Sequence, residues 1–158
     1  MLRRISAHLQ STIPAPVADA HCDGPCGIYD PASARIAAEA VRSMTKKLHA
    51  LHIHDPNNAS EVLAYNNSLS RYVAIKEEEA ETTKRQLLIL WTDYFKPQHL
   101  EAYPDLHDIF WKAAKLCSAC KVGVSIDDAN ALVATCQKIH DIFWATKNRD
   151  VKWELAGG

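Results

Sequence analysis

Residues 104–144 read PDLHDIFWKAAKLCSACKVGVSIDDANALVATCQKIHDIFW, and they carry the clearest structural pattern in the chain. Side chains that can be buried recur in both halves at steps of three and four residues, the spacing of one helix face. They are Leu106, Phe110, Ala113, Cys117 and Cys120, then Leu132, Cys136, Ile139 and Phe143. Pro104 suits the first turn of a helix that ends at Gly123, and Ser125 with Asp128 resembles a capping box. The stretch therefore predicts two amphipathic helices joined by a tight turn.

Another helix is expected upstream, from about Pro31 to near His52. Its apolar residues at near-helical spacing are Ile36, Val41, Met44, Leu48 and Leu51. Turn-forming residues at 54–58 interrupt the pattern, and Asn58 or Ser60 can cap a helix that follows.

That next segment is helical as far as Phe95-Lys96-Pro97, as one long helix or as two. Its apolar stripe contains Leu63, Leu69, Val73, Ala80, Thr83, Leu87 and Trp91 or Tyr94. Its charged residues Lys76, Glu77, Glu78, Glu79 and Glu81 are interpreted as a solvated face. Four amphipathic helices joined by short connections predict an all-α fold, an antiparallel four-helix bundle over about residues 32–147.

Composition narrows the range of partners. The 158 residues carry a formal net charge of -1, which supplies no large field for nucleic acid or an anionic membrane. The longest apolar run, residues 87–91, is far shorter than the roughly 20 residues of a membrane-spanning helix. We therefore expect neither a nucleic-acid nor a membrane partner. Five cysteines, an odd number, favour reduced thiols or metal ligands over a disulfide framework, which suits the cytoplasm.

Residues 1–20 differ from the rest of the chain. They contain Arg3 and Arg4 but a single acidic residue, and Ala18-Asp19-Ala20 places small residues just before His21. We expect a leader that a protease removes, leaving residues 21–158 as the mature domain. If the leader is a transit peptide, the protein belongs in an organelle instead.

The segment that follows, His21-Cys22-Asp23-Gly24-Pro25-Cys26-Gly27-Ile28-Tyr29, is named here the hook (residues 21–29). After cleavage before His21, the free amine, the imidazole, and the amide nitrogen and thiolate of Cys22 lie within a few bonds of one another. Gly24-Pro25 suits a sharp turn that returns the Cys26 thiolate to the same metal ion.

Planar nitrogen and thiolate donors favour Ni(II), whereas a structural zinc site takes four side-chain ligands in a tetrahedron. Anionic sulfur and a deprotonated amide also stabilise Ni(III). The expected chemistry is therefore superoxide disproportionation to dioxygen and hydrogen peroxide by Ni(III)/Ni(II) cycling, with an imidazole that binds in the oxidised state. Tyr29 is placed to gate access.

The hook, Asp30-Pro31 and Ala34-Arg35-Ile36 together resemble the start of mature nickel-containing superoxide dismutases. The resemblance continues through residues 91–97, WTDYFKP, to residues 142–147, IFWATK. It implies a four-helix bundle assembled as a homohexamer, with one nickel ion per subunit.

Residue by residue, the resemblance implies that nickel is held by the amine and imidazole of His21, the amide and thiolate of Cys22, and the Cys26 thiolate. Tyr29 matches the family's gating tyrosine. Tyr94 and Lys96 match residues that line or charge the approach to the metal.

Two positions depart from the family pattern. A glutamate and an arginine hold the axial imidazole in the family, and the matching positions here are Ala37 and, near a gap, Glu79. Support for His21 is then missing, or comes from Glu39 or another chain.

Other interpretations remain at this point. The hook can trap nickel or copper without turnover, which would make the protein a non-catalytic metal-binding bundle. Cys117-x-x-Cys120 can be a redox pair, although small buried thiols are the commoner case in a helical stripe. His49, His52 and His54 can form a zinc or auxiliary nickel site, or can simply face solvent at a helix end.

Overall fold

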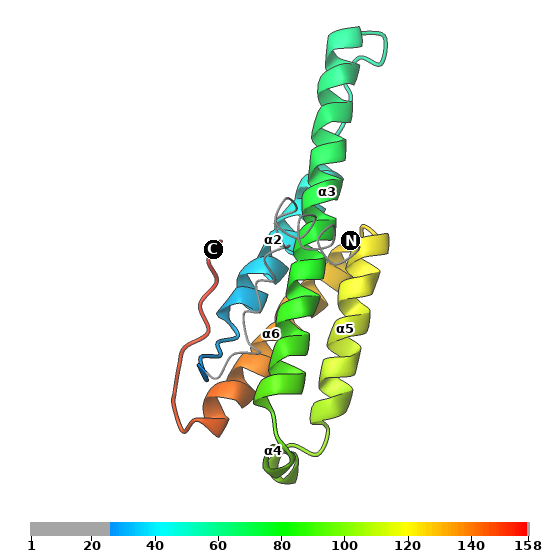
Figure 1. Ribbon diagram of the computed structural model, residues 1–158. Helices are drawn as coiled ribbons and strands as arrows, with labels where there is room; N and C mark the ends of the chain where they lie inside the picture. Colours follow the sequence, from blue (N-terminus) through cyan, green and yellow to red (C-terminus); the bar gives the residue numbers. More distant parts are fainter. Residues whose placement is uncertain (1–25, 158) are drawn as a thin grey trace, which may run out of the picture.

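The computed structural model of the chain describes residues 26–157, and four long helices make up most of that part (Figure 1). They are α2 (Ala32–Ala50), α3 (Ala59–Ile89), α5 (Leu106–Val122) and α6 (Ile126–Thr146). A π-helical turn, η1 (Leu90–Tyr94), and a short helix, α4 (Pro97–Ala102), connect α3 to α5. Residues 26–157 contain no β-strand, so the predicted all-α fold is confirmed.

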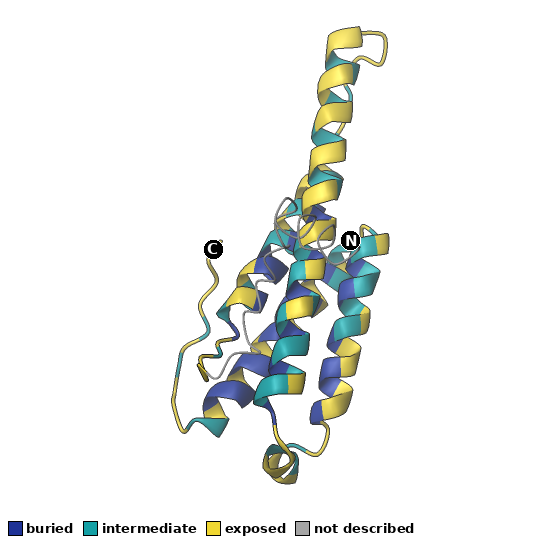
Figure 2. Cartoon of the chain, viewed as in Figure 1, coloured by how far each residue is buried: buried dark blue, intermediate teal, exposed yellow. Residues whose placement is uncertain are grey.

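The four long helices form a bundle in which each packs against two others. Helix α2 contacts α3 and α6, and α5 contacts the same two helices. Short connections reverse the chain between neighbours, so adjacent helices run antiparallel, as the sequence predicts (Figure 1). Buried surface lies on the inward faces (Figure 2). None of the described helices is long and apolar enough to cross a membrane.

The helix starts follow the local capping chemistry. The Asn58 side chain accepts hydrogen bonds from the backbone N–H groups of Ser60 and Glu61 at the start of α3. Ser125 does the same for Asp128, at 3.1 Å, at the start of α6. Helix α5 begins at Leu106, so Pro104 precedes its first turn and does not lie in it as predicted, and the N-cap residue Asp105 makes no side-chain capping hydrogen bond. The short helix α4 was not predicted, because six residues are too few to show an apolar period.

The bundle does not include the whole of α3. Between residues 46 and 75 no residue is buried, and most of this stretch, called the arm here, projects beyond α5 and α6 (Figures 1 and 2). Leu63, expected in the core stripe, is 71% exposed, and Ile36 of α2 is 52% exposed. Helix α2 instead buries Ala34, Ala37 and Ala38, whose small side chains allow its neighbours to come close. The apolar period of α3 therefore continues along the arm, past the point where α5 packs against it within residues 26–157.

Lys76 is buried, although the sequence predicts that it lies on a solvated face. Only 2% of its surface is exposed. Its ammonium group donates hydrogen bonds to the carbonyl oxygens of Cys120, Lys121 and Gly123, the last two at 2.9 Å. These carbonyls lie at the C-terminal end of α5, where a helix has unpaired acceptors and partial negative charge. Burial lowers the pKa of Lys76, while the three acceptors satisfy its charged form.

We expect Lys76→Met to lower the free energy of unfolding by about 2–4 kcal/mol, because it leaves buried carbonyls without donors. Urea denaturation monitored by circular dichroism measures this change. Lys112→Met is the matched control, since Lys112 is exposed and pairs only with Asp108 on the surface. Equal destabilisation by the two substitutions would contradict the role assigned to Lys76.

Candidate metal centre

The described part of the hook begins at Cys26, and the predicted ligands His21 and Cys22 lie outside the described residues. The Cys26 side chain is exposed. Gly27 follows with φ of +66°, a left-handed conformation that costs other residues roughly 1–2 kcal/mol. The chain therefore turns between the Cys26 thiol and Tyr29.

The hook is fixed to the bundle where α2 begins. Asp30 accepts a hydrogen bond from the backbone N–H of Ala32 at 2.8 Å. Pro31 is buried, and its carbonyl accepts from the N–H of Arg35 at 3.1 Å. Tyr29 is half-buried and packs against the hydrophobic core. These contacts place Tyr29 on the bundle surface three residues after Cys26.

An open cavity of about 420 Å³ lies beside Tyr29. Its lining residues are Gly27, Tyr29, Asp93, Tyr94, Lys96, Gln98 and His99. The cavity therefore brings together residues of the hook, η1 and the start of α4. It includes Tyr29, Tyr94 and Lys96, the three approach residues named from the sequence.

Tyr94 connects this cavity to the core. Its ring centroid lies 5.6 Å from that of Tyr29 and 4.4 Å from that of Phe143. Its hydroxyl is 2.6 Å from the hydroxyl oxygen of Thr146, which itself donates to the carbonyl of Phe143 at 2.7 Å. Because Thr146 has a single hydroxyl hydrogen, Tyr94 is the donor in the bond between them. The proton of Tyr94 is thus held toward α6.

Two ammonium groups lie around Tyr94. Lys96 is exposed and lines the cavity. Lys147 places its Nζ 5.3 Å from the ring centroid of Tyr94 and 4.6 Å from that of Phe143. Asp93 is the acidic residue of the lining, and its carboxylate accepts from the Thr92 hydroxyl at 2.7 Å. The lining itself carries one ammonium group and one carboxylate, and the nearby ammonium group of Lys147 adds a second positive charge, which favours a small anion in spite of the chain's overall charge.

His99 is a residue of this site that the sequence reasoning did not identify. Its ring stacks on Tyr94 at 5.6 Å with an interplanar angle of 17°. Its Nδ1 accepts a hydrogen bond from the backbone N–H of Lys96 at 3.1 Å, so in the neutral ring the proton lies on Nε2. His99 lies on α4, which no periodic pattern predicted. The one sequence feature that could have indicated His99 is the spacing Lys96-Pro97-x-His99, which places a histidine in the first turn of a helix that starts at Pro97.

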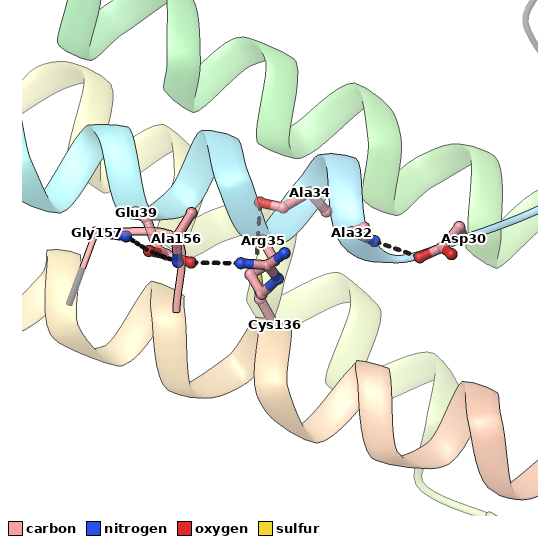
Figure 3. A network of polar contacts seen from close by, with 8 residues as sticks. All are labelled: Asp30, Ala32, Ala34, Arg35, Glu39, Cys136, Ala156 and Gly157. Carbon is pink, nitrogen blue, oxygen red and sulfur yellow. Dashed lines mark hydrogen bonds and ion pairs between the residues drawn. The ribbon is translucent and has the colours of Figure 1, made fainter. Parts of the chain in front are cut away.

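Glu39 was considered as a substitute partner for His21, and its contacts are already fully used within the described chain (Figure 3). Oε1 accepts from Arg35 at 2.9 Å. Oε2 accepts from the backbone N–H groups of Ala156 and Gly157 at 2.8 and 3.0 Å. Ala37 and Glu79 are the two positions that depart from the family pattern. Ala37 is buried in the bundle. Partial burial raises the pKa of Glu79.

The other three cysteines of residues 26–157 lie inside the bundle, away from solvent. Cys117, Cys120 and Cys136 are buried. Burial raises the pKa of Cys117 to about 12 and that of Cys120 to about 11, and it also raises the pKa of Cys136. A reactive cysteine needs a thiolate near neutral pH. Among residues 26–157, Cys26 therefore has the one exposed thiol suited to a metal ion, and the burial of Cys117 and Cys120 favours the interpretation as small buried thiols over a redox pair.

The chain is similar to known proteins in sequence and in fold. Residues 16–147 match the family of nickel-containing superoxide dismutases. The chain is 40% identical over 131 residues to Superoxide dismutase [Ni] of Streptomyces seoulensis, covering 81% of this chain and 88% of that protein. It is 38% identical over 134 residues to the protein of the same name from Streptomyces coelicolor, covering 85% and 93%.

Solved structures give the same assignment. A crystal structure of Ni-containing superoxide dismutase, with nickel ligation corresponding to the oxidised state, matches with a TM-score of 0.68 and 40% identity. The match covers 82% of this chain and 100% of that one. A native nickel superoxide dismutase structure at 1.30 Å matches with a TM-score of 0.69, 38% identity and the same coverage. The chain belongs to the family of nickel-containing superoxide dismutases.

Proposed function

We propose that this chain is a superoxide dismutase that uses one nickel ion per subunit, held by His21, Cys22 and Cys26. The amine and imidazole of His21, the amide and thiolate of Cys22 and the Cys26 thiolate form the ligand set. The main support is that the exposed Cys26 leads directly into the cavity lined by Tyr29, Tyr94 and Lys96. The enzymes this chain resembles favour this function over non-catalytic metal trapping.

The reaction converts two superoxide ions and two protons into one dioxygen and one hydrogen peroxide. When bound, nickel supplies a Ni(III)/Ni(II) couple that accepts one electron and returns it. The chain has to attract the anion, restrict access and deliver protons.

The cavity residues suit these three tasks. Lys96 lines the cavity and Lys147 lies beside the Tyr94 ring, so both attract an anion toward this part of the surface. Tyr29 lines the cavity three residues after Cys26 and packs near Tyr94, a position suited to restricting access to the thiol. His99 lines the same cavity, and its Nε2–H is available as a hydrogen-bond donor. Tyr94 directs its own hydroxyl hydrogen at the Thr146 oxygen.

The remaining assignments follow from the sequence. A protease removes residues 1–20, since His21 can contribute its amine only as the first residue. The mature domain, residues 21–158, assembles as a homohexamer and acts in the cytoplasm, or in an organelle if the leader directs it there. Its substrate is superoxide, with no nucleic acid or membrane as a partner.

The first prediction concerns the N-terminus. Active, nickel-loaded protein is expected to begin at His21, because an amide in place of the amine removes one donor. Intact-mass spectrometry of the purified enzyme measures this directly. Active protein that retains Met1 and its full complement of nickel would contradict the proposed ligand set.

The second prediction separates the hook from the buried thiols. Cys26→Ser is expected to abolish nickel binding and to reduce superoxide consumption by more than about 100-fold, since a serine hydroxyl stays protonated and is a poor nickel ligand. Cys117→Ser, the matched control, removes a buried thiol with a raised pKa and should retain the activity per nickel. Metal analysis and pulse radiolysis give the two readouts. Loss of activity with Cys117→Ser at full nickel content would overturn the assignment.

The third prediction concerns electrostatic attraction. Lys96→Gln is expected to lower kcat/KM roughly 3- to 10-fold at low ionic strength and to weaken its dependence on salt. Lys138→Gln is the control, because Lys138 is also exposed but pairs with Asp105 away from the cavity. An unchanged salt dependence in Lys96→Gln would show that this ammonium group does not guide the substrate.

A further inference from the structure

The connection between α2 and α3 carries two histidines in direct contact. It lies at the tip of the arm, at the opposite end of the molecule from α4 (Figure 1). His52 and His54 are both exposed, and their Nε2 atoms are 2.6 Å apart. Their rings meet edge to face, with centroids 4.1 Å apart. Two ring nitrogens therefore converge on one point away from the hook.

The orientation of His52 is fixed by its other nitrogen. Nδ1 of His52 lies 3.1 Å from the carbonyl oxygen of Ala50. A carbonyl oxygen can only accept, so Nδ1 carries the hydrogen, and the neutral ring has its lone pair on Nε2. His54 then donates its Nε2–H to that lone pair. Histidines that bind metals commonly donate their second N–H to a backbone carbonyl in this way, which orients the ligating nitrogen.

Glu61 holds the backbone of His54 in place. Its carboxylate accepts from the N–H of His54 at 2.5 Å and from that of Asp55 at 3.2 Å. The hydrogen bond from the backbone N–H of His54 lowers the pKa of Glu61, and the one from Asp55 adds to the effect. The carboxylate is therefore a negative charge beside the segment that carries the two rings, which favours a cation bound there.

We propose that His52 and His54 bind one divalent first-row transition-metal ion through their Nε2 atoms, at a site separate from the hook. The ion takes the place of the hydrogen shared by the two nitrogens, and His54 releases its Nε2 proton to solvent or carries it on Nδ1. Imidazole ligands suit Cu(II), Ni(II) and Zn(II), with Cu(II) the tightest. The inference does not depend on superoxide chemistry.

The geometry requires a small adjustment. With metal–nitrogen bonds of about 2.0–2.1 Å, two neighbouring ligands are separated by about 2.9–3.4 Å, depending on coordination geometry. The two nitrogens must therefore move apart by less than about 1 Å, which exposed rings allow. Within residues 26–157 no group of three or more histidine, cysteine, aspartate or glutamate side chains is placed to hold a metal ion. Water completes the coordination, so we infer an open, exchangeable site.

The experiment uses the full chain with Cys22→Ser and Cys26→Ser, so that the hook does not contribute. Isothermal titration with NiCl2 or ZnCl2 in a non-coordinating buffer is expected to show one binding event per chain. His52→Ala or His54→Ala should weaken it at least about tenfold, since each removes one of two ligands. His49→Ala is the matched control, because His49 is an exposed neighbour whose Nε2 lies 2.7 Å from the Val124 carbonyl.

A second readout identifies the ligands. Cu(II) bound to the same protein should show hyperfine coupling to two imidazole nitrogens in electron paramagnetic resonance, and to one or none after His54→Ala. Circular dichroism of each variant shows that the arm remains folded. Binding that survives both histidine substitutions, or that His49→Ala weakens equally, would overturn the proposal. The superoxide-consuming activity of otherwise unmodified protein carrying His52→Ala tests the hook separately and should not change.

Discussion

The packing of α6 into the bundle is the contact on which the rest of the candidate metal centre depends. Leu132, Ile139 and Phe143 of α6 are fully buried. Phe143 lies against Tyr94, whose hydroxyl is bound to Thr146 one turn further along α6. Tyr94 in turn contacts Tyr29, three residues from Cys26. The last helix of the chain therefore positions the residues next to its N-terminal hook, through side chains that are distant in sequence.

The π-helical turn η1 allows Tyr94 to make these contacts. The N–H of Phe95 bonds to the carbonyl of Leu90 at 3.0 Å, five residues back rather than four. Leu90 and Phe95 both remain buried, while Tyr94 reaches the boundary between the core and the cavity. Such turns insert one residue into a helix and are frequent at functional sites. Here the inserted residue allows α3 to keep its core contacts and still place Tyr94 beside Tyr29.

The C-terminal segment holds the helix that follows the hook. Residues after 147 lie beyond the part that matches the family. Their backbone binds the buried carboxylate of Glu39, which also pairs with Arg35, and Trp153 lies 5.8 Å from the Arg35 guanidinium (Figure 3). A buried carboxylate is costly unless its oxygens are paired, and here Arg35 and two N–H groups provide the partners. The C-terminal segment thus fastens α2 to the rest of the structure.

The sequence by itself determined the long helices, and it alone carries the ligand set predicted for the hook. Asn58 and Ser125 cap their helices as the local pattern predicts, because capping and apolar period depend on residues only a few positions apart. The donor set predicted for the hook likewise comes from six contiguous residues. The tertiary structure alone decided that Lys76 is buried, that His99 joins the cavity and that the arm stands free. These outcomes depend on which distant segments meet, and the periodicity of one segment contains no information about its neighbours.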